Sequence, residues 1–204
     1  MVMAPDSAAR RYSAVAILLH WASALGVLAL IGMGLTMTHA GLAPMRLFPL
    51  YQWHKSVGIT VLVLTGLRLA WRLAHRPPPH PAAMPARERR AAGAAHAILY
   101  GLLIGLPLTG WAVVSLSPFN IPTVLYGLVP WPHLPLAPLL TDPAGAEGAF
   151  KLLHAYGAWF LTALLVLHVA AALRHHLILR DGVLWRMLPG RAAAMPPEPL
   201  DSTR

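Results

Sequence analysis

The chain has 204 residues, of which 57% are hydrophobic and only 11% are charged, and its mean hydropathy is +0.58. This balance is typical of a membrane protein rather than of a soluble domain. Its net charge of +9 suits either nucleic acid or membrane loops that face anionic lipid. Cysteine is absent, which excludes disulfides, thiolate-held iron–sulfur clusters, zinc-finger arrangements and a C-x-x-C-H attachment site for covalent haem. Any cofactor must therefore be held by nitrogen, oxygen or methionine sulfur.

Four apolar windows are each long enough to cross a bilayer, which takes about twenty residues. In chain order they are residues 12–37, 53–71, 93–116 and 150–174. The first is too long for a signal-peptide core, so we expect it to be retained as a helix. Pro107 lies inside the third window, where a membrane helix tolerates a single proline as a kink. We predict an all-α membrane protein, with a four-helix transmembrane bundle in one domain over residues 1–190 and a disordered cytoplasmic tail over residues 191–204.

Two proline-rich stretches separate the windows, because proline cannot continue a helix. Residues 75–85, together with the basic residues 87–90, are expected to form a solvent loop. Residues 117–143 are rich in Trp, Leu and Pro. We expect this second stretch to lie along the membrane interface.

Basic residues are distributed unequally between the two sides of these windows, thirteen against three. The larger group is Arg10, Arg11, Arg68, Arg72, Arg76, Arg87, Arg89, Arg90, Arg174, Arg180, Arg186, Arg191 and Arg204, and the smaller is Arg46, Lys55 and Lys151. By the positive-inside tendency, both termini are predicted to be cytoplasmic. Since the arginines flank membrane segments and no nucleic-acid-binding fold organises them, nucleic acid is not an expected partner.

The fourth window carries two histidines, His154 and His168, fourteen residues apart. Fourteen residues advance a helix by about 1400°, within about 40° of four full turns, so the two side chains share a face about 21 Å apart. Ionisable side chains inside a bilayer are costly and usually functional. Gly157 and Ala158 lie on the same stripe. Such small residues either leave room for a flat macrocycle or let helices pack closely.

A haem with two axial histidines needs a second imidazole at the same depth on another helix. His20 lies about 12 Å from the cytoplasmic end of the first window, and His168 lies about as far from that end of the fourth. His54 and His154 both lie close to the outer start of their windows. The four histidines therefore predict an inner and an outer bis-histidine site. A zinc site would instead need three or four converging ligands, and a proton relay would lack intramembrane Asp or Glu to alternate with histidine.

His96 and His175 also lie near membrane depth. His96, close to the cytoplasmic start of the third window, is a candidate contact of a haem propionate or a quinone, and a competing ligand. His175 lies on the stripe of His168 but about 10 Å closer to the cytoplasmic surface. It is the main rival for the inner ligand and is otherwise a propionate partner. The remaining histidines are expected at the solvated surface: His39, His75, His80, His133 and His176.

Four basic residues near the window ends are candidate propionate contacts. Lys55 and Lys151 are placed for the outer haem, and Arg11 or Arg174 for the inner haem. Snorkelling of these long side chains toward lipid headgroups explains the same positions equally well.

Five segments, in this order, resemble the bacterial cytochrome b-561 family. They are LHW at residues 19–21, WHKSVG at 53–58, AHAILYGLLIGLPLTGW at 95–111, LHAYGAWFLTALLVLHVAAALRHH at 153–176 and RDGVLWRMLPG at 180–190. The resemblance implies a four-helix membrane protein with two non-covalent b haems, whose ligands come from the first, second and fourth helices. Carried over by position, these are His20 and His168 for the inner haem and His54 and His154 for the outer haem.

The resemblance also implies a function. Members of the family exchange electrons with the quinone pool, and at least one branch oxidises superoxide on the periplasmic side while reducing ubiquinone. We therefore expect a di-haem cytochrome of the bacterial inner membrane that carries electrons between the periplasmic face and the quinone pool. Ubiquinone is its expected acceptor or donor, and superoxide or a periplasmic redox protein its expected partner. Superoxide:ubiquinone oxidoreductase is the enzyme activity this implies.

Two alternatives remain open from the sequence. In one, the protein is a haem-binding membrane anchor that relays electrons for a separate dehydrogenase or periplasmic partner. In the other, it is a haem-free transporter that uses its histidines as a relay. The oligomeric state has no signal in the sequence.

Overall fold

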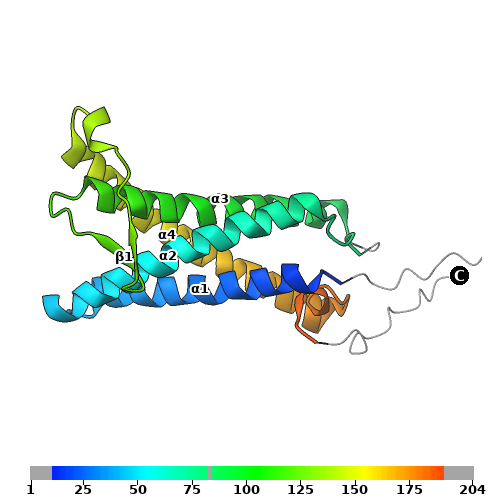
Figure 1. The fold of residues 1–204 in the computed structure, drawn as a ribbon. Coiled ribbons are helices and arrows are strands. Elements are labelled where there is room, and N and C mark those ends of the chain that lie inside the picture. The colour runs from blue at the N-terminus through cyan, green and yellow to red at the C-terminus, as the bar shows by residue number, and fades with distance from the viewer. Residues whose placement is uncertain (1–10, 82–83, 191–204) are drawn as a thin grey trace, which may run out of the picture.

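Four long helices make up most of the described chain (Figure 1). The computed structural model describes residues 11–81 and 84–190. The long helices are α1 (Ala14–His39), α2 (Pro44–Ala74), α3 (Ala86–Leu116) and α4 (Pro143–Arg174). The smaller elements are strands β1 (Thr123–Leu125) and β2 (Val129–Trp131), and the short helices η1 (Ala137–Leu139), η2 (His175–Leu179) and η3 (Trp185–Met187). The four long helices are each long and apolar enough to cross a membrane, which confirms the predicted transmembrane bundle.

Three of these helices begin before the apolar windows of the sequence. α2 begins nine residues before residue 53, and α3 and α4 each begin seven residues before residues 93 and 150. Residues 87–90, predicted as part of a solvent loop, instead lie in the first turns of α3. Pro143 is the first residue of α4, where a helix needs no N–H donor, and the Asp142 carboxylate accepts a hydrogen bond from Gly145 N at 2.9 Å. Hydropathy misses such turns because it registers only apolar character.

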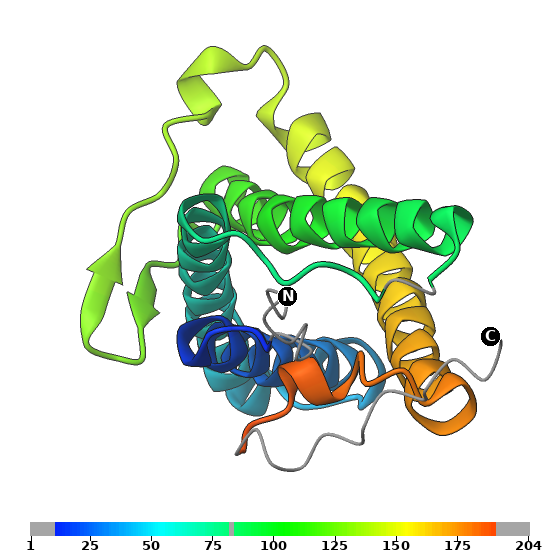
Figure 2. The same ribbon diagram turned by 90° about the vertical axis from the view of Figure 1, so that its right-hand side faces the viewer.

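The four helices follow one another around a common centre (Figure 2). α1 packs against α2, α2 against α3, and α3 against α4. Glycines let two of these pairs approach closely. A Cβ atom at Gly26 would lie 2.7 Å from Val61 Cγ2, and one at Gly157 would lie 2.8 Å from Leu106 Cδ2. Of the two roles open to Gly157 in the sequence, the structure therefore shows close helix packing.

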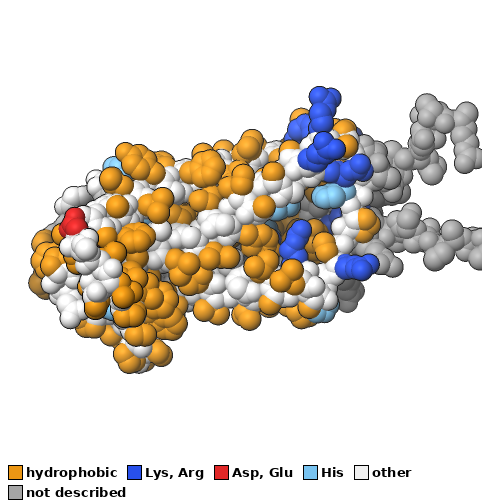
Figure 3. All heavy atoms as spheres, turned by 90° about the horizontal axis from the view of Figure 1, so that it is seen from above, with side chains coloured by type: hydrophobic (Ala, Val, Ile, Leu, Met, Phe, Trp, Pro, Cys, Tyr) orange, Lys and Arg blue, Asp and Glu red, His pale blue; other side chains and the backbone are white. Residues whose placement is uncertain are grey.

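The two ends of the bundle differ in connections and in charge. We call the end with the 75–85 connection and with residues 11 and 190 the termini end, and the end with the 117–142 segment the loop end. Figure 3 shows basic side chains gathered at the termini end of the face in view, whereas apolar side chains cover much of the middle. The predicted tail, residues 191–204, and Arg10 of the predicted basic group lie outside the described residues.

A β-hairpin from the 117–142 segment packs beside α2 at the loop end. Strands β1 and β2 pair antiparallel, with Val124 opposite Pro130. At the tip, Tyr126 N donates to Ser56 Oγ at 2.9 Å, and the Tyr126 and Thr60 hydroxyls lie 2.6 Å apart. These bonds fix the hairpin to the middle of α2.

The last described residues fold back onto the start of α1 at the termini end. Tyr12 N donates to Arg186 O at 3.3 Å, and Trp21 Nε1 donates to Met187 O at 2.8 Å. The Arg11 guanidinium donates to the carbonyl oxygens of Leu188 and Gly190. Residues 180–190 thus tie the end of the described chain to its beginning.

Candidate functional site

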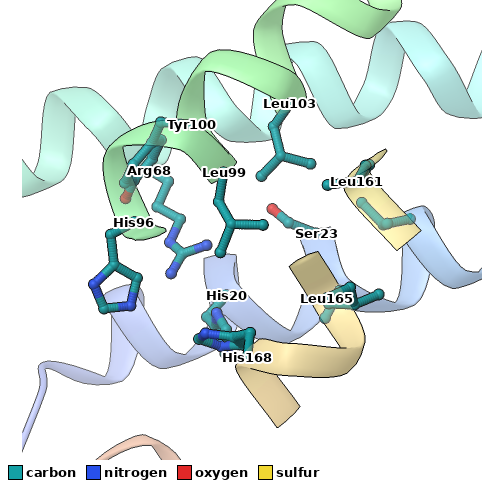
Figure 4. A pocket seen from close by; sticks show the side chains of 12 residues that line it. His20, Ser23, Arg68, His96, Leu99, Tyr100, Leu103, Leu161, Leu165 and His168 are labelled. Carbon is teal, nitrogen blue, oxygen red and sulfur yellow. The ribbon is translucent and has the colours of Figure 1, made fainter. Parts of the chain in front are cut away.

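The four candidate ligands meet in two pairs, one at each end of the bundle. At the termini end, the rings of His20 on α1 and His168 on α4 have centroids 6.4 Å apart (Figure 4). At the loop end, the rings of His54 on α2 and His154 on α4 have centroids 6.2 Å apart. We call these the termini-side pair and the loop-side pair. The pairing is the one predicted from the depths of the histidines in the sequence.

Both separations suit one metal ion between two imidazoles. A metal–imidazole nitrogen bond is about 2 Å long, so two nitrogens on opposite sides of one ion lie about 4 Å apart and the ring centroids about 6 Å apart. Two axial imidazoles leave the equatorial positions of the ion to other donors, and the four nitrogens of a porphyrin fill these in a haem. The spacing of both pairs therefore fits a bis-histidine haem.

Each pair contains a buried ring nitrogen without a partner among the described residues. Within residues 11–81 and 84–190, His20 Nδ1 and His54 Nδ1 are buried and make no hydrogen bond. Buried polar atoms in native proteins nearly always have a partner, and water, an ion or a functional role accounts for many of the exceptions. Each pair contains one such histidine.

The main chain of α3 holds His154 in place. His154 Nδ1 lies 3.0 Å from Leu106 O and 3.2 Å from Thr109 Oγ1. Donation from Nδ1–H to the carbonyl fixes the tautomer and leaves Nε2 with a free lone pair for a metal ion. A Cβ atom at Gly110 would lie 3.2 Å from His154 Cε1, so the glycine makes space for the ring. Thus α3 supplies no ligand to this pair but positions one of its rings.

The fourteen-residue spacing of α4 recurs on every long helix. At each level, two helices contribute the histidine pair and the other two contribute one flanking residue each. The eight positions are His20 and Gly34 on α1, His54 and Arg68 on α2, His96 and Gly110 on α3, and His154 and His168 on α4. The loop-side pair is therefore flanked by glycines and the termini-side pair by two basic side chains.

The flanking residues lie beside the pairs in the structure. A Cβ atom at Gly34 would lie 3.9 Å from His54 Cε1. At the other level, Arg68 and His96 line a pocket together with His20 and His168, and the rings of His96 and His168 are 5.7 Å apart. Figure 4 shows the Arg68 side chain extending into this pocket between His96 and His20.

The remainder of the pocket wall is mostly apolar. It includes Val27, Leu99, Leu103, Leu161 and Leu165. The Arg68 guanidinium carbon also lies 5.4 Å from the centre of the Tyr100 ring, a cation–π contact. An apolar cofactor with a charged edge is the kind of ligand that such a lining suits.

The four basic residues predicted to contact haem propionates bind other parts of the protein in the structure. Lys55 Nζ donates to Pro122 O at 3.4 Å, and Lys151 pairs with Glu147 at 2.8 Å. Arg174 pairs with Glu88 at 3.4 Å, and Arg11 binds the carbonyls of residues 188 and 190. Each of the four basic candidates thus contacts another part of the protein, and their contact with a propionate stays a prediction.

His175, the rival of His168, contacts an aspartate beyond the end of α4. Its Nδ1 is 2.5 Å from Asp181 Oδ2, and Asp181 Oδ1 accepts a hydrogen bond from Val183 N at 3.2 Å. His168, not His175, lines the pocket beside His20. The geometry therefore favours His168 as the partner of His20.

Sequence comparison identifies the kind of protein that carries these pairs. A family model described as prokaryotic cytochrome b561 matches residues 11–190. The chain belongs to this family. This confirms the resemblance seen in the sequence and makes the protein a membrane cytochrome b, which binds haem b and transfers electrons. With its four spans, this cytochrome is a multi-pass protein of the bacterial inner membrane.

Its relatives cover nearly the same length of chain. It is 33% identical over 180 residues to cytochrome b561 homolog 2 of Escherichia coli (strain K12), covering 87% of this cytochrome and 91% of that protein. It is 32% identical over 184 residues to the probable superoxide oxidase CybB of Yersinia pestis, covering 88% and 97%. Cytochrome b561 homolog 1 of Escherichia coli (strain K12) is 29% identical over 191 residues, covering 89% and 98%.

Proposed function

We propose that this cytochrome holds two b haems and carries electrons between the periplasmic face of the membrane and the quinone pool. His20 and His168 would ligate one haem iron, and His54 and His154 the other. The observation that carries the proposal is the recurrence of one separation, 6.4 Å and 6.2 Å between ring centroids, at two levels of a single bundle. A single coincidence of two rings would support only one site.

The haem iron, when bound, supplies one-electron chemistry by alternating between its ferric and ferrous states. The two histidines of each pair would hold it, and the chemistry that it would supply there is electron transfer rather than oxygen binding. The hydrogen bond from His154 to Leu106 O keeps that ring in the orientation in which Nε2 is free to bind metal.

An apolar layer separates the two levels. His154 and His168 are about 21 Å apart along α4, and the buried core of Val27, Val61 and Leu161 lies between the levels. This core excludes water from the interior of the bundle. Two levels divide the crossing of the membrane into two shorter steps, which a single cofactor could not do.

The orientation follows from charge. Because the basic residues gather at the termini end, we assign that end to the cytoplasm and the loop end to the periplasm. The loop-side pair then exchanges electrons with a periplasmic reactant, and the termini-side pair with quinone or quinol. Residues 1–190 would act as one transmembrane domain.

Superoxide is the periplasmic reactant that we propose, with ubiquinone as the acceptor. The similarity to a probable superoxide oxidase supports this choice. Arg46, Lys55 and Lys151 near the loop end would attract an anion, although Glu147 partly cancels the charge of Lys151. The activity would be that of a superoxide:ubiquinone oxidoreductase.

A second candidate function is an electron relay for a separate dehydrogenase or periplasmic partner. Large apolar side chains exposed at the loop end are compatible with it, because such side chains suit a docking surface as well as lipid. Phe119 is 80% exposed, Leu128 81% and Leu139 77%. Superoxide-dependent ubiquinone reduction by the purified cytochrome alone would count against this relay.

Haem quantification with a redox titration tests the proposal. We expect two haems per chain with two midpoint potentials in the purified protein. His168→Ala should remove the termini-side haem and spare the loop-side one. One haem per chain would break the scheme. Protein without a b-type α band would favour a histidine-relay transporter instead.

A further inference from the structure

The two levels of the bundle differ in fixed charge. At the loop level the flanking positions are Gly34 and Gly110, which carry no side chain. At the termini level the equivalent positions are Arg68 and His96, and both line the pocket. The same helical framework therefore surrounds two different electrostatic environments.

Arg68 is an unusual residue for its place. It lies inside a helix that is apolar enough to span a membrane, about 9 Å before the end of α2 at Ala74. Within residues 11–81 and 84–190, no Asp or Glu carboxylate lies within 4.0 Å of its guanidinium. A guanidinium stays protonated in proteins, and a half-buried charge without a counter-ion is costly. Its position next to His20 and His168 points to a role toward the group that they bind.

We propose that Arg68 is a positioning residue that makes the termini-side haem the higher-potential centre of the two. This inference rests on the proposed two-haem function. When ferric iron takes up one electron and becomes ferrous, the charge of the haem core falls by one unit. A fixed positive charge nearby destabilises the more positive ferric form and so raises the reduction potential. If the guanidinium also binds a haem carboxylate, it neutralises a negative charge there, which acts in the same direction.

The loop level is biased the other way. Its flanking glycines bring no charge, and the hydrogen bond from His154 Nδ1 to Leu106 O makes that imidazole a stronger electron donor to iron. Stronger donation stabilises the ferric form and lowers the reduction potential. Lys55, next to His54 in the chain, directs its ammonium group to Pro122 O, and Lys151 pairs with Glu147. At equilibrium, an electron that enters at the loop end therefore resides mainly on the termini-side haem.

The test is a potentiometric titration of purified holoprotein, followed in the α band. His168→Ala assigns the transitions, because the one that remains belongs to the loop-side haem. In the unmodified protein, the transition lost in His168→Ala should have the higher midpoint. Arg68→Met keeps an unbranched apolar stem and removes the charge. It should lower the ratio of reduced to oxidised termini-side haem at a fixed potential by about tenfold, or about 59 mV for a one-electron couple, and leave the loop-side midpoint in place.

Two variants serve as controls. Arg68→Lys keeps the charge and should retain most of the termini-side potential. Arg76→Met removes an exposed arginine just beyond the end of α2 and should leave both midpoints nearly unchanged.

Three outcomes would each contradict either the role of Arg68 or the proposed two-haem function. Two haems with an unchanged termini-side midpoint in Arg68→Met would overturn this inference and leave the two-haem function standing. A lower midpoint for the termini-side haem in the unmodified protein would overturn it as well, and this measurement decides the matter even if Arg68→Met fails to retain that haem. Absence of haem from the unmodified protein would instead overturn the proposed function.

Discussion

Gly110→Ala tests whether the main chain of α3 positions a haem ligand. The added methyl would lie 3.2 Å from Cε1 and 3.4 Å from Nδ1 of His154, closer than the optimal carbon–carbon separation of about 3.5–4.0 Å. The imidazole must move by a few tenths of an ångström to relieve this contact. That movement pulls Nδ1 away from Leu106 O, with which it now makes a 3.0 Å hydrogen bond.

The expected cost lies in haem affinity. Loss of an outer partner of a metal-bound histidine typically weakens binding by about 10- to 100-fold, which corresponds to about 1.4–2.8 kcal/mol. The hydrogen bond alone contributes about 0.5–1.5 kcal/mol, so displacement of the ring makes up the rest. Alanine stabilises a helix by up to about 1 kcal/mol relative to glycine, and this gain acts on folding and not on the ligand geometry.

The assay is haem content together with the α-band spectrum of the purified variant. Gly110→Ala should lose loop-side haem under dilution or mild detergent while its termini-side haem stays. Gly105→Ala is the matched control on the same helix, because a Cβ atom at Gly105 would meet nothing within 4 Å. Full retention of both haems in Gly110→Ala, with unchanged spectrum and midpoints, would refute the positioning role of α3.

Three further predictions concern packing and ligand choice. Gly26→Ala should destabilise the protein by about 1–3 kcal/mol, seen as a lower Tm, because its methyl would lie 2.7 Å from Val61 Cγ2; an unchanged Tm would show that α1 and α2 can separate freely. Thr60→Val removes the 2.6 Å contact with the Tyr126 hydroxyl. Loss of this hydrogen bond should destabilise the docked hairpin by about 1 kcal/mol, so proteolysis within the hairpin should become faster. His175→Ala should keep two haems, and loss of the termini-side haem in this variant would move the ligand assignment by one stripe position.

The histidine pairs could be predicted from the sequence because helix geometry fixes both depth and facing. His154 and His168 share a face by periodicity, and the alternating direction of the helices assigns each a partner at its own depth. No contact information was needed for this step. The same reasoning also separated His168 from His175, which lies seven residues further on.

Arg68 was missed because it was counted among the arginines that flank the membrane. Its fourteen-residue spacing from His54 is the same as that from His154 to His168, and this signal was present in the sequence. The contacts of His154 with Leu106 and Thr109 gave no such signal. They join residues 45 to 48 positions apart. One of the acceptors is a backbone carbonyl, which every residue type has, so no residue pattern indicates it.

Helix ends and short strands were also beyond the sequence. Hydropathy windows end where polar residues begin, whereas α3 continues through residues 87–90 because backbone hydrogen bonding does not depend on apolar character. The hairpin was not predicted, because the prolines of residues 117–143 indicate only that no helix continues there. Pro130 belongs to strand β2. In the structure it lies in a sheet of only two strands, where each strand has a free edge.

The position of α4 has a consequence for biosynthesis. Both histidine pairs take one member from α4, which is the last of the four long helices to leave the ribosome. A chain that has made only α1, α2 and α3 carries His20 and His54 but neither His168 nor His154, their partners in the two pairs. Neither pair has both of its histidines until translation is almost complete. On the proposed two-haem function, capture of both haems by these pairs would therefore follow insertion of the final span.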